Sequence, residues 1–153
     1  MSNQMMAGTV PEVQALSDQQ PGASNMPGSL TAKQFAIEVA RVLADTRCHQ
    51  VRVLDVGGIS PVTDFLVLCS GTSPRQMKSA SDAAEELGDG VGYRTLTRVA
   101  DSAQWIVQDF VDVVVHVFSQ DARYYYDLDN LWGDARKVEW ERPDQVRRDD
   151  LHG

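Results

Sequence analysis

The sequence has no long apolar run, only two cysteines, and no Lys or Arg before Lys33. A membrane-spanning helix needs about 20 consecutive apolar residues, so no such helix is expected. A secretory leader would need a basic start followed by an apolar stretch, and none is predicted here. Cys48 and Cys69 lack the spacing of metal ligands. We therefore expect buried thiols in a protein of the reducing cytoplasm.

Positive charge is also scarce. The chain has 14 Lys and Arg against 22 Asp and Glu, for a formal net charge of −8. Residues 31–135 carry 9 basic and 15 acidic residues, whereas residues 136–153 hold 5 of each and cancel. An acidic domain repels phosphate backbones, so we expect little direct nucleic-acid binding and favour a basic protein partner. Solubility alone is the alternative explanation of the charge.

The 153 residues divide into three predicted parts. Residues 1–29 are rich in Ser, Gln, Gly and Pro without sustained periodicity, and a disordered extension is predicted. Residues 30–135 have the length and apolar content of one domain with a core. Residues 136–153 are dense in charge and are predicted to be a disordered tail, in which Trp140 is the one aromatic that could anchor to the domain.

Helical and strand patterns alternate within the domain, which predicts an α/β fold with a mixed sheet of about five strands and packing helices. Thr31 and Gln34 form a capping box that begins the first helix. The first two strands are joined by a short link and should pair antiparallel. In order, we expect a helix at 32–46, strands at 51–56 and 64–70, a helix from Ser73 to Gly88, a strand near 93–99, strands at 104–109 and 113–118, and a helix from Gln120 to Gly133.

The segment "QWIVQDFVDVVVHVF", residues 104–118, is the most hydrophobic of the chain yet contains Asp109, Asp112 and His116. The chain must reverse around the two aspartates, and Asp is common in turns because its side chain bonds the local backbone. A metal site is the alternative. However, the two aspartates are three residues apart across a turn, whereas a nucleotidyl-transfer site places two carboxylates two residues apart on one strand face.

His116 and Trp105 each have a structural and a functional interpretation. His116 shares a strand face with Val114 and Phe118, and both faces of this strand are apolar. A neutral core histidine with one hydrogen-bonded ring nitrogen is therefore predicted, with a catalytic base as the alternative. Trp105 begins a strand at the end of the sheet, where it could fill the core or anchor a partner.

Two further segments are candidates for surface contacts. "SGTSPRQ", residues 70–76, combines a strand end, a tight glycine turn and a helix N-terminus, which can hold an anion. It lacks the lysine of a phosphate-binding loop, and capping alone explains Ser73. The consecutive tyrosines at 124–126 are spread about 100° apart around a helix, so at least one should lie at the surface.

Three blocks of sequence, "TDFLVLCSGTSPRQMKSASD", "WIVQDFVDVVVHVF" and "RYYYDLDNLWGDA", resemble the ribosomal silencing factor family, also called RsfS or Iojap. The resemblance covers residues 31–135. It implies a protein that is not an enzyme, needs no cofactor or metal, and binds the large ribosomal subunit through ribosomal protein L-fourteen. Bound there, it would block subunit association and repress translation when nutrients are limiting. The implied fold is nucleotidyltransferase-like without the catalytic carboxylates.

Carried over by position, the resemblance places Trp105, Asp109, Phe110 and Asp112 on the partner-binding surface. The tryptophan and phenylalanine would supply apolar contact, and the aspartates would meet a basic partner. A homodimer of the free protein is compatible with the same resemblance. The alternative function is a metal-dependent nucleotidyltransferase that uses Asp109, Asp112 and His116.

The sequence departs from the family pattern at Arg98 and Val99, where the family usually has a Glu-Gly pair shortly before the tryptophan. This departure leaves the local contacts near Trp105 open.

Overall fold

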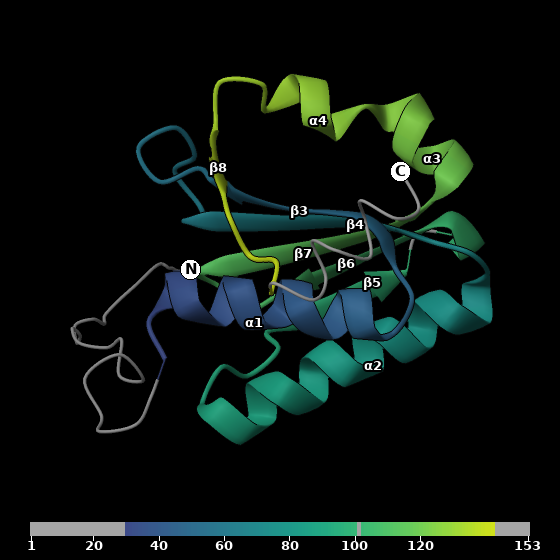
Figure 1. The fold of residues 1–153 in the computed structure, drawn as a ribbon, viewed down its shortest axis with the longest axis horizontal. Coiled ribbons are helices and arrows are strands. Elements are labelled where there is room, and N and C mark those ends of the chain that lie inside the picture. Colours follow the sequence, from purple (N-terminus) through teal and green to yellow (C-terminus); the bar gives the residue numbers. More distant parts are fainter. Residues whose placement is uncertain (1–29, 101, 143–153) are drawn as a thin grey trace.

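The computed structural model describes residues 30–100 and 102–142, which form one sheet with helices on both faces (Figure 1). Residues 1–29, the predicted extension, and residues 143–153 lie outside the described part. The elements in chain order are α1 (Ala32–Asp45), β3 (His49–Asp55), β4 (Phe65–Gly71), α2 (Pro74–Val91), β5 (Thr97–Ala100), a short 3-10 helix η2 (Ser102–Gln104), β6 (Trp105–Asp109), β7 (Val113–Ser119), α3 (Gln120–Tyr126), α4 (Leu128–Leu131) and β8 (Arg136–Val138).

The sheet has six strands in the order β5-β6-β7-β4-β3-β8. β4 and β7 pair in parallel, whereas β3 with β4, β3 with β8, β5 with β6, and β6 with β7 pair antiparallel. The predicted mixed α/β sheet is confirmed, with one strand more than expected. The crossover through α2 ends on β5, which runs parallel to β4 but lies at the edge of the sheet, beyond β6 and β7.

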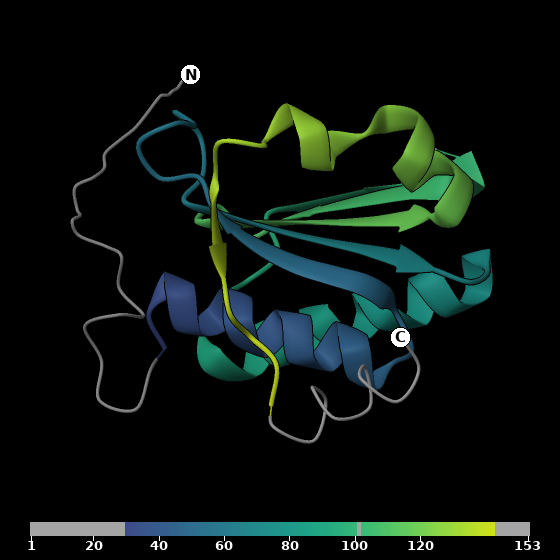
Figure 2. The ribbon, with the colours of Figure 1, turned by 45° about the horizontal axis from the view of Figure 1, so that its top comes forward.

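α1 and α2 cover one face of the sheet (Figure 2). Three alternate residues of β7, Val113, Val115 and Val117, are fully buried against this pair of helices. The predicted capping box is present, because the Thr31 hydroxyl accepts from the Gln34 amide at 3.1 Å and the Gln34 side chain accepts from the Thr31 amide at 2.9 Å. Caps of this kind satisfy amides that the first helical turn leaves free.

The second helix runs past its predicted stop. α2 begins as expected, with Ser73 accepting from the Gln76 amide at 3.1 Å. It then continues through Gly88 to Val91 and ends at Gly92, which has a φ of +90°. A side chain at Gly88 would meet the Tyr93 carbonyl at 2.2 Å, so this glycine allows close packing inside the helix rather than ending it.

α3 and α4 cover part of the opposite face, over a smaller core that includes Leu68 and Phe118. The single helix predicted here is broken at Asp127, which has a φ of +51° and caps α3. Arg123 is buried and joins both helices to the sheet: its guanidinium contacts Asp129 at 2.7 Å and Ser70 at 3.2 Å. A charge buried among hydrogen-bonding partners of this kind holds the helices in one position.

The predicted disordered tail is wrong for residues 136–142. β8 pairs with the outer edge of β3, and Trp140 beyond it is only 7% exposed. The Trp140 indole N–H donates to the Val51 carbonyl at 3.1 Å, and the Trp140 carbonyl accepts from Arg41 at 2.7 Å. A strand of three residues is too short for an alternating pattern to be recognised in the sequence. The density of charge was therefore the only signal in this segment, and it led to the prediction of disorder.

Trp140→Ala should lower the free energy of unfolding by about 3 kcal/mol, because it removes a buried ring and a hydrogen bond to β3. The free energy can be measured by urea denaturation. Glu139→Ala, at an exposed neighbour, is the matched control and should change it by less than about 0.5 kcal/mol. Equal effects of the two substitutions would show that the ring does not hold this segment.

Candidate partner-binding face

One face of β5, β6 and β7 is left partly uncovered by the helices. On β6, Ile106 and Gln108 are buried toward α1 and α2, whereas Trp105, Val107 and Asp109 on the other face are only half-buried. The register places residues of β7 and β5 beside them on the same face. We call this surface the open face; it consists of Val99, Trp105, Val107, Asp109, Val114 and His116.

Trp105 lies at the end of the open face nearest α3. Its indole N–H donates to Nδ1 of His116 at 3.1 Å. Its ring lies 5.1 Å from that of Phe118 and 4.6 Å from that of Tyr126, measured between centroids. Trp105 is therefore partly a packing residue and partly a surface residue, which combines the two interpretations that the sequence left open.

His116 is neutral at physiological pH. Burial lowers its pKa to about 4, because the charged imidazolium would lose its hydration. Its Nδ1 accepts the hydrogen bond from Trp105, so this nitrogen is not available as a base in this arrangement. These two observations agree with the predicted neutral histidine with one hydrogen-bonded ring nitrogen. The expected place in the core is not found, because His116 is half-buried and lies on the open face.

The turn between β6 and β7 forms the other end of the site. The Asp109 carboxylate accepts from the Val111 amide at 2.7 Å, which confirms its expected role in the turn. Val111 has a φ of +77° and is 52% exposed. The Asp112 carbonyl accepts from the amides of Asp64 and Phe65, both at 3.1 Å. Burial, and then the charge of Asp64, raise the pKa of the Asp112 carboxyl.

The assignment of Phe110 to the partner-binding surface is wrong. Phe110 is 2% exposed, and its ring packs edge-on against Phe35 of α1 with centroids 5.0 Å apart. Residues alternate between faces along a strand. Because Asp109 belongs to the open face, the residue that follows it points into the core.

The other three predicted site residues, Trp105, Asp109 and Asp112, do not form a single cluster. Trp105 and Asp109 share a face but lie at opposite ends of β6, about 13 Å apart at the usual rise of a strand. Asp112 lies in the turn beyond. Sequence reasoning missed two exposed aliphatic residues at this end, Leu96 and Val111, which are 65% and 52% exposed. The position of Val111 between two turn-forming aspartates could have indicated its exposure.

The described residues offer little to a metal or a nucleotide. Within residues 30–100 and 102–142, no group of three or more His, Cys, Asp or Glu side chains is placed to hold a metal ion. At the "SGTSPRQ" turn, the Gln76 side chain accepts from the Thr72 amide at 2.9 Å and Ser73 caps the helix, so capping accounts for both. Across the described helices, none has the length and apolar content needed to cross a membrane.

The low pKa of His116 makes a testable contribution to stability. The pKa falls from 6.5, the ordinary value of a solvated histidine, to about 4 in the folded protein, so the unfolded chain binds the proton more readily between these values. The contribution is fully present above pH 6.5 and is lost as the pH falls toward 4. Between pH 7 and pH 5 the free energy of unfolding should therefore fall by about 2 kcal/mol through this group.

His116→Phe should remove that part of the pH dependence, measured by urea denaturation at the two pH values. His49→Gln, at an exposed histidine, is the matched control and should keep it. If His116→Phe loses as much stability as the unsubstituted protein between pH 7 and pH 5, His116 is not buried in its neutral form.

Known proteins resemble this chain in sequence and in fold. The family model described as ribosomal silencing factor during starvation, RsfS, matches residues 29–152. The ribosomal silencing factor RsfS of Bacillus subtilis is 39% identical over 92 residues, which cover 60% of this chain and 78% of that protein.

Two crystal structures have the same fold. A protein from Chromobacterium violaceum aligns with a TM-score of 0.65 at 24% identity, over 74% of this chain and 94% of that one. A protein from Bacillus halodurans aligns with a TM-score of 0.58 at 32% identity, over 67% and 95% of the two chains. The family match covers the whole described domain, including β8 and Trp140. The chain belongs to the ribosomal silencing factor (RsfS) family.

Proposed function

We propose that this protein binds the large ribosomal subunit in the cytoplasm through its open face. Ribosomal protein L-fourteen is the proposed contact, and the bound protein blocks association with the small subunit and so represses translation under nutrient limitation. The observation that carries the proposal is an apolar sheet face, half-covered by helices, in a chain of the ribosomal silencing factor family. Exposed apolar patches with a polar surround are typical of protein interaction sites.

The composition of the open face supports a protein partner over RNA. Val99 of β5 and Val107 of β6 lie side by side, with His116 of β7 next in the same row. Val114 lies beside Asp109 in the adjacent row, and Trp105 is at the margin of this group. None of the six residues that make up this face is Lys or Arg, and a phosphate backbone is bound mainly through such residues. A half-buried tryptophan beside aliphatic side chains is typical of the centre of a protein interface.

The turn end supplies charge that complements a basic partner. Asp109 lies on the open face and Asp112 follows in the turn, with the exposed Val111 between them. Carboxylates at the rim of an interface steer a basic surface into place and contribute mainly to the association rate. A partner would have to span both ends of β6, since the aromatic contacts and the acidic contacts lie about 13 Å apart.

The proposed mechanism needs binding alone. A protein of this size that occupies a joining surface of the large subunit excludes the small subunit by volume. The extent of the block then depends on the ratio of its free concentration to its Kd. No bond is made or broken, so the mechanism requires neither a cofactor nor a metal. The nucleotidyltransferase alternative has less support, because Asp109 bonds the turn and His116 is neutral with Nδ1 engaged.

Val99→Asp should weaken binding to ribosomal protein L-fourteen at least about tenfold, because it would bury an unpaired charge at the interface. Val99 is 58% exposed in the free protein, so its melting temperature should hardly change. Leu131→Asp, at an exposed leucine on α4, makes the same chemical change outside the open face and should leave affinity intact. Binding can be measured by calorimetry.

Trp105→Ala should also weaken binding, by about 2 kcal/mol or roughly thirtyfold. It should lower the melting temperature too, because Trp105 packs on Phe118 and Tyr126. Normal binding by the folded fraction of both Trp105→Ala and Val99→Asp would exclude the open face as the interface.

Added to dissociated ribosomal subunits in several-fold excess, the protein should reduce the fraction that rejoins and should co-sediment with the large subunit. Sucrose gradients measure both effects. The Val99→Asp protein should do neither at the same concentration. An unchanged peak of joined ribosomes with the unsubstituted protein would reject the proposed function, whatever its affinity for the isolated ribosomal protein.

A further inference from the structure

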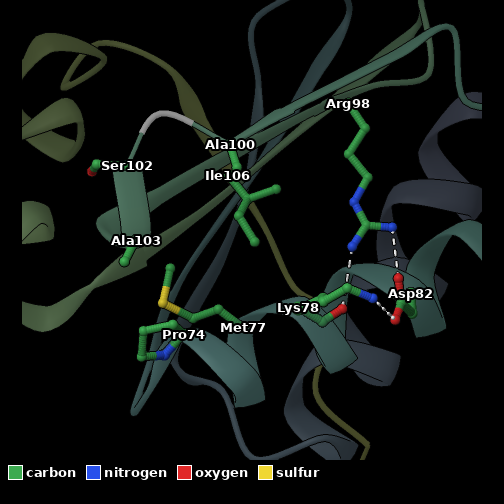
Figure 3. A pocket seen from close by; sticks show the side chains of 9 residues that line it. All are labelled: Pro74, Met77, Lys78, Asp82, Arg98, Ala100, Ser102, Ala103 and Ile106. Carbon is green, nitrogen blue, oxygen red and sulfur yellow. Dashed lines mark hydrogen bonds and ion pairs between the residues drawn. The ribbon is translucent and has the colours of Figure 1, made fainter.

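A pocket lies on the other side of the sheet, between α2 and β5 (Figure 3). Its volume is about 510 Å³. Its inner wall is apolar and consists of Met77 from α2, Ile106 from β6, and the small side chains of Ala100 and Ala103. Met77 and Ile106 are almost fully buried beneath it, whereas the two alanines are exposed. The pocket has room for an apolar side chain.

The strand beside the pocket is an edge of the sheet. Among the described strands, β5 pairs with β6 on one side only, so its outer N–H and C=O groups have no strand partner there. Arg98 and Ala100 line the pocket because their side chains point from β5 toward α2. A chain paired with the free edge would place its alternate side chains on that same side, toward α2. Extended peptides bind other domains in this way, by adding a strand to an exposed sheet edge.

Charge along α2 selects for a basic chain. Asp82, Glu85, Glu86 and Asp89 recur at three- and four-residue spacing, so they share one side of the helix. This side faces β5, because Arg98 contacts Asp82 at 2.7 Å and Glu85 at 2.9 Å.

The nearby cations leave this stripe acidic. Lys78 contacts Asp82 at 3.1 Å, so it and Arg98 meet carboxylates of the stripe rather than a ligand. Glu86 and Asp89, one turn further along, are exposed. Four carboxylates against two cations leave the stripe on α2 with an excess of negative charge. Of the four, only Asp82 lines the pocket itself, so the acidic part of the groove lies beyond the pocket along α2.

We propose that the groove between α2 and β5 binds an extended basic segment of a partner protein, which adds to β5 as a strand. One apolar side chain of the segment fills the pocket, and Lys or Arg side chains that follow it lie against the carboxylates of α2. This surface is on the opposite side of the sheet from the open face. The protein can therefore hold this segment and a partner on its open face at the same time.

The probe for this groove is a synthetic ten-residue peptide in which one leucine is followed by lysines at every second position, with threonines between them. The leucine and the lysines then lie on the same side of the added strand, toward α2. It should bind with a saturable Kd that rises with salt, measured by fluorescence anisotropy. Hydrogen exchange should slow at the amides of Thr97–Ala100 when the peptide is bound, because outward-facing amides gain partners. The control peptide keeps the leucine and the lysines but has proline in place of two threonines, so it lacks N–H groups needed for strand pairing and should give no such protection.

Two substitutions in the groove test its separate parts. Ala100→Phe fills the pocket and should weaken peptide binding at least about tenfold. Glu86→Lys with Asp89→Lys reverses exposed charge without touching the core, and should both weaken binding and remove its salt dependence. Asp134→Lys with Glu139→Lys makes the same change in charge near the opposite edge and should leave the Kd within about twofold.

Three results would overturn the proposal. The first is unchanged exchange at β5 when the peptide is bound. The second is weaker peptide binding in Trp105→Ala, which would place the peptide on the open face instead. The third is a dimer that Ala100→Phe converts to a monomer in light scattering without peptide, which would make the occupant a second copy of this chain.

Discussion

The parallel pairing of β4 with β7 determines where the helices that follow these two strands lie. The two strands match over seven residue pairs at the centre of the sheet, and β4 is buried almost throughout. From the same end of this pair, the chain leaves β4 into α2 on one face and leaves β7 into α3 on the other (Figure 2). The long α2 can cover its face as far as β6. The short α3 and α4 cannot, so the open face is a consequence of topology rather than of an unusual surface composition.

At the end of the open face nearest α3, the same residues stabilise the fold and form the exposed surface. The hydrogen bond from Trp105 to His116 joins β6 to β7. It runs diagonally between the strands, because the residue of β6 that pairs with His116 is Val107. It also satisfies the indole N–H without water, and a neutral imidazole is required to accept it. A partner that packs on Trp105 therefore contacts a ring that is already held in place. Binding then loses less side-chain entropy at this residue.

Much of the fold follows from local patterns in the sequence, and the exceptions have local causes. The capping box at Thr31 and the run of apolar residues in β7 predicted α1 and the central strand correctly, because each depends on neighbours in sequence. The local pattern could not predict which face of the sheet Phe110 lies on, since this depends on where β6 ends and the turn begins. The break at Asp127 depends on one left-handed residue. The partners of Trp105 and Trp140 depend on strand register and on contacts up to 99 residues apart.

Because β8 follows all the other described elements in the sequence, the edge of β3 that it covers stays bare until Arg136–Val138 has been synthesised. A bare edge beside buried residues such as Val53 is a template for pairing with another chain. β8 covers this edge of β3 with a strand of three residues, of which Arg136 and Lys137 are exposed. Its own outer edge is too short and too charged to recruit a further strand. A chain that stopped before Arg136 would therefore be expected to aggregate, even where the rest of its core could form.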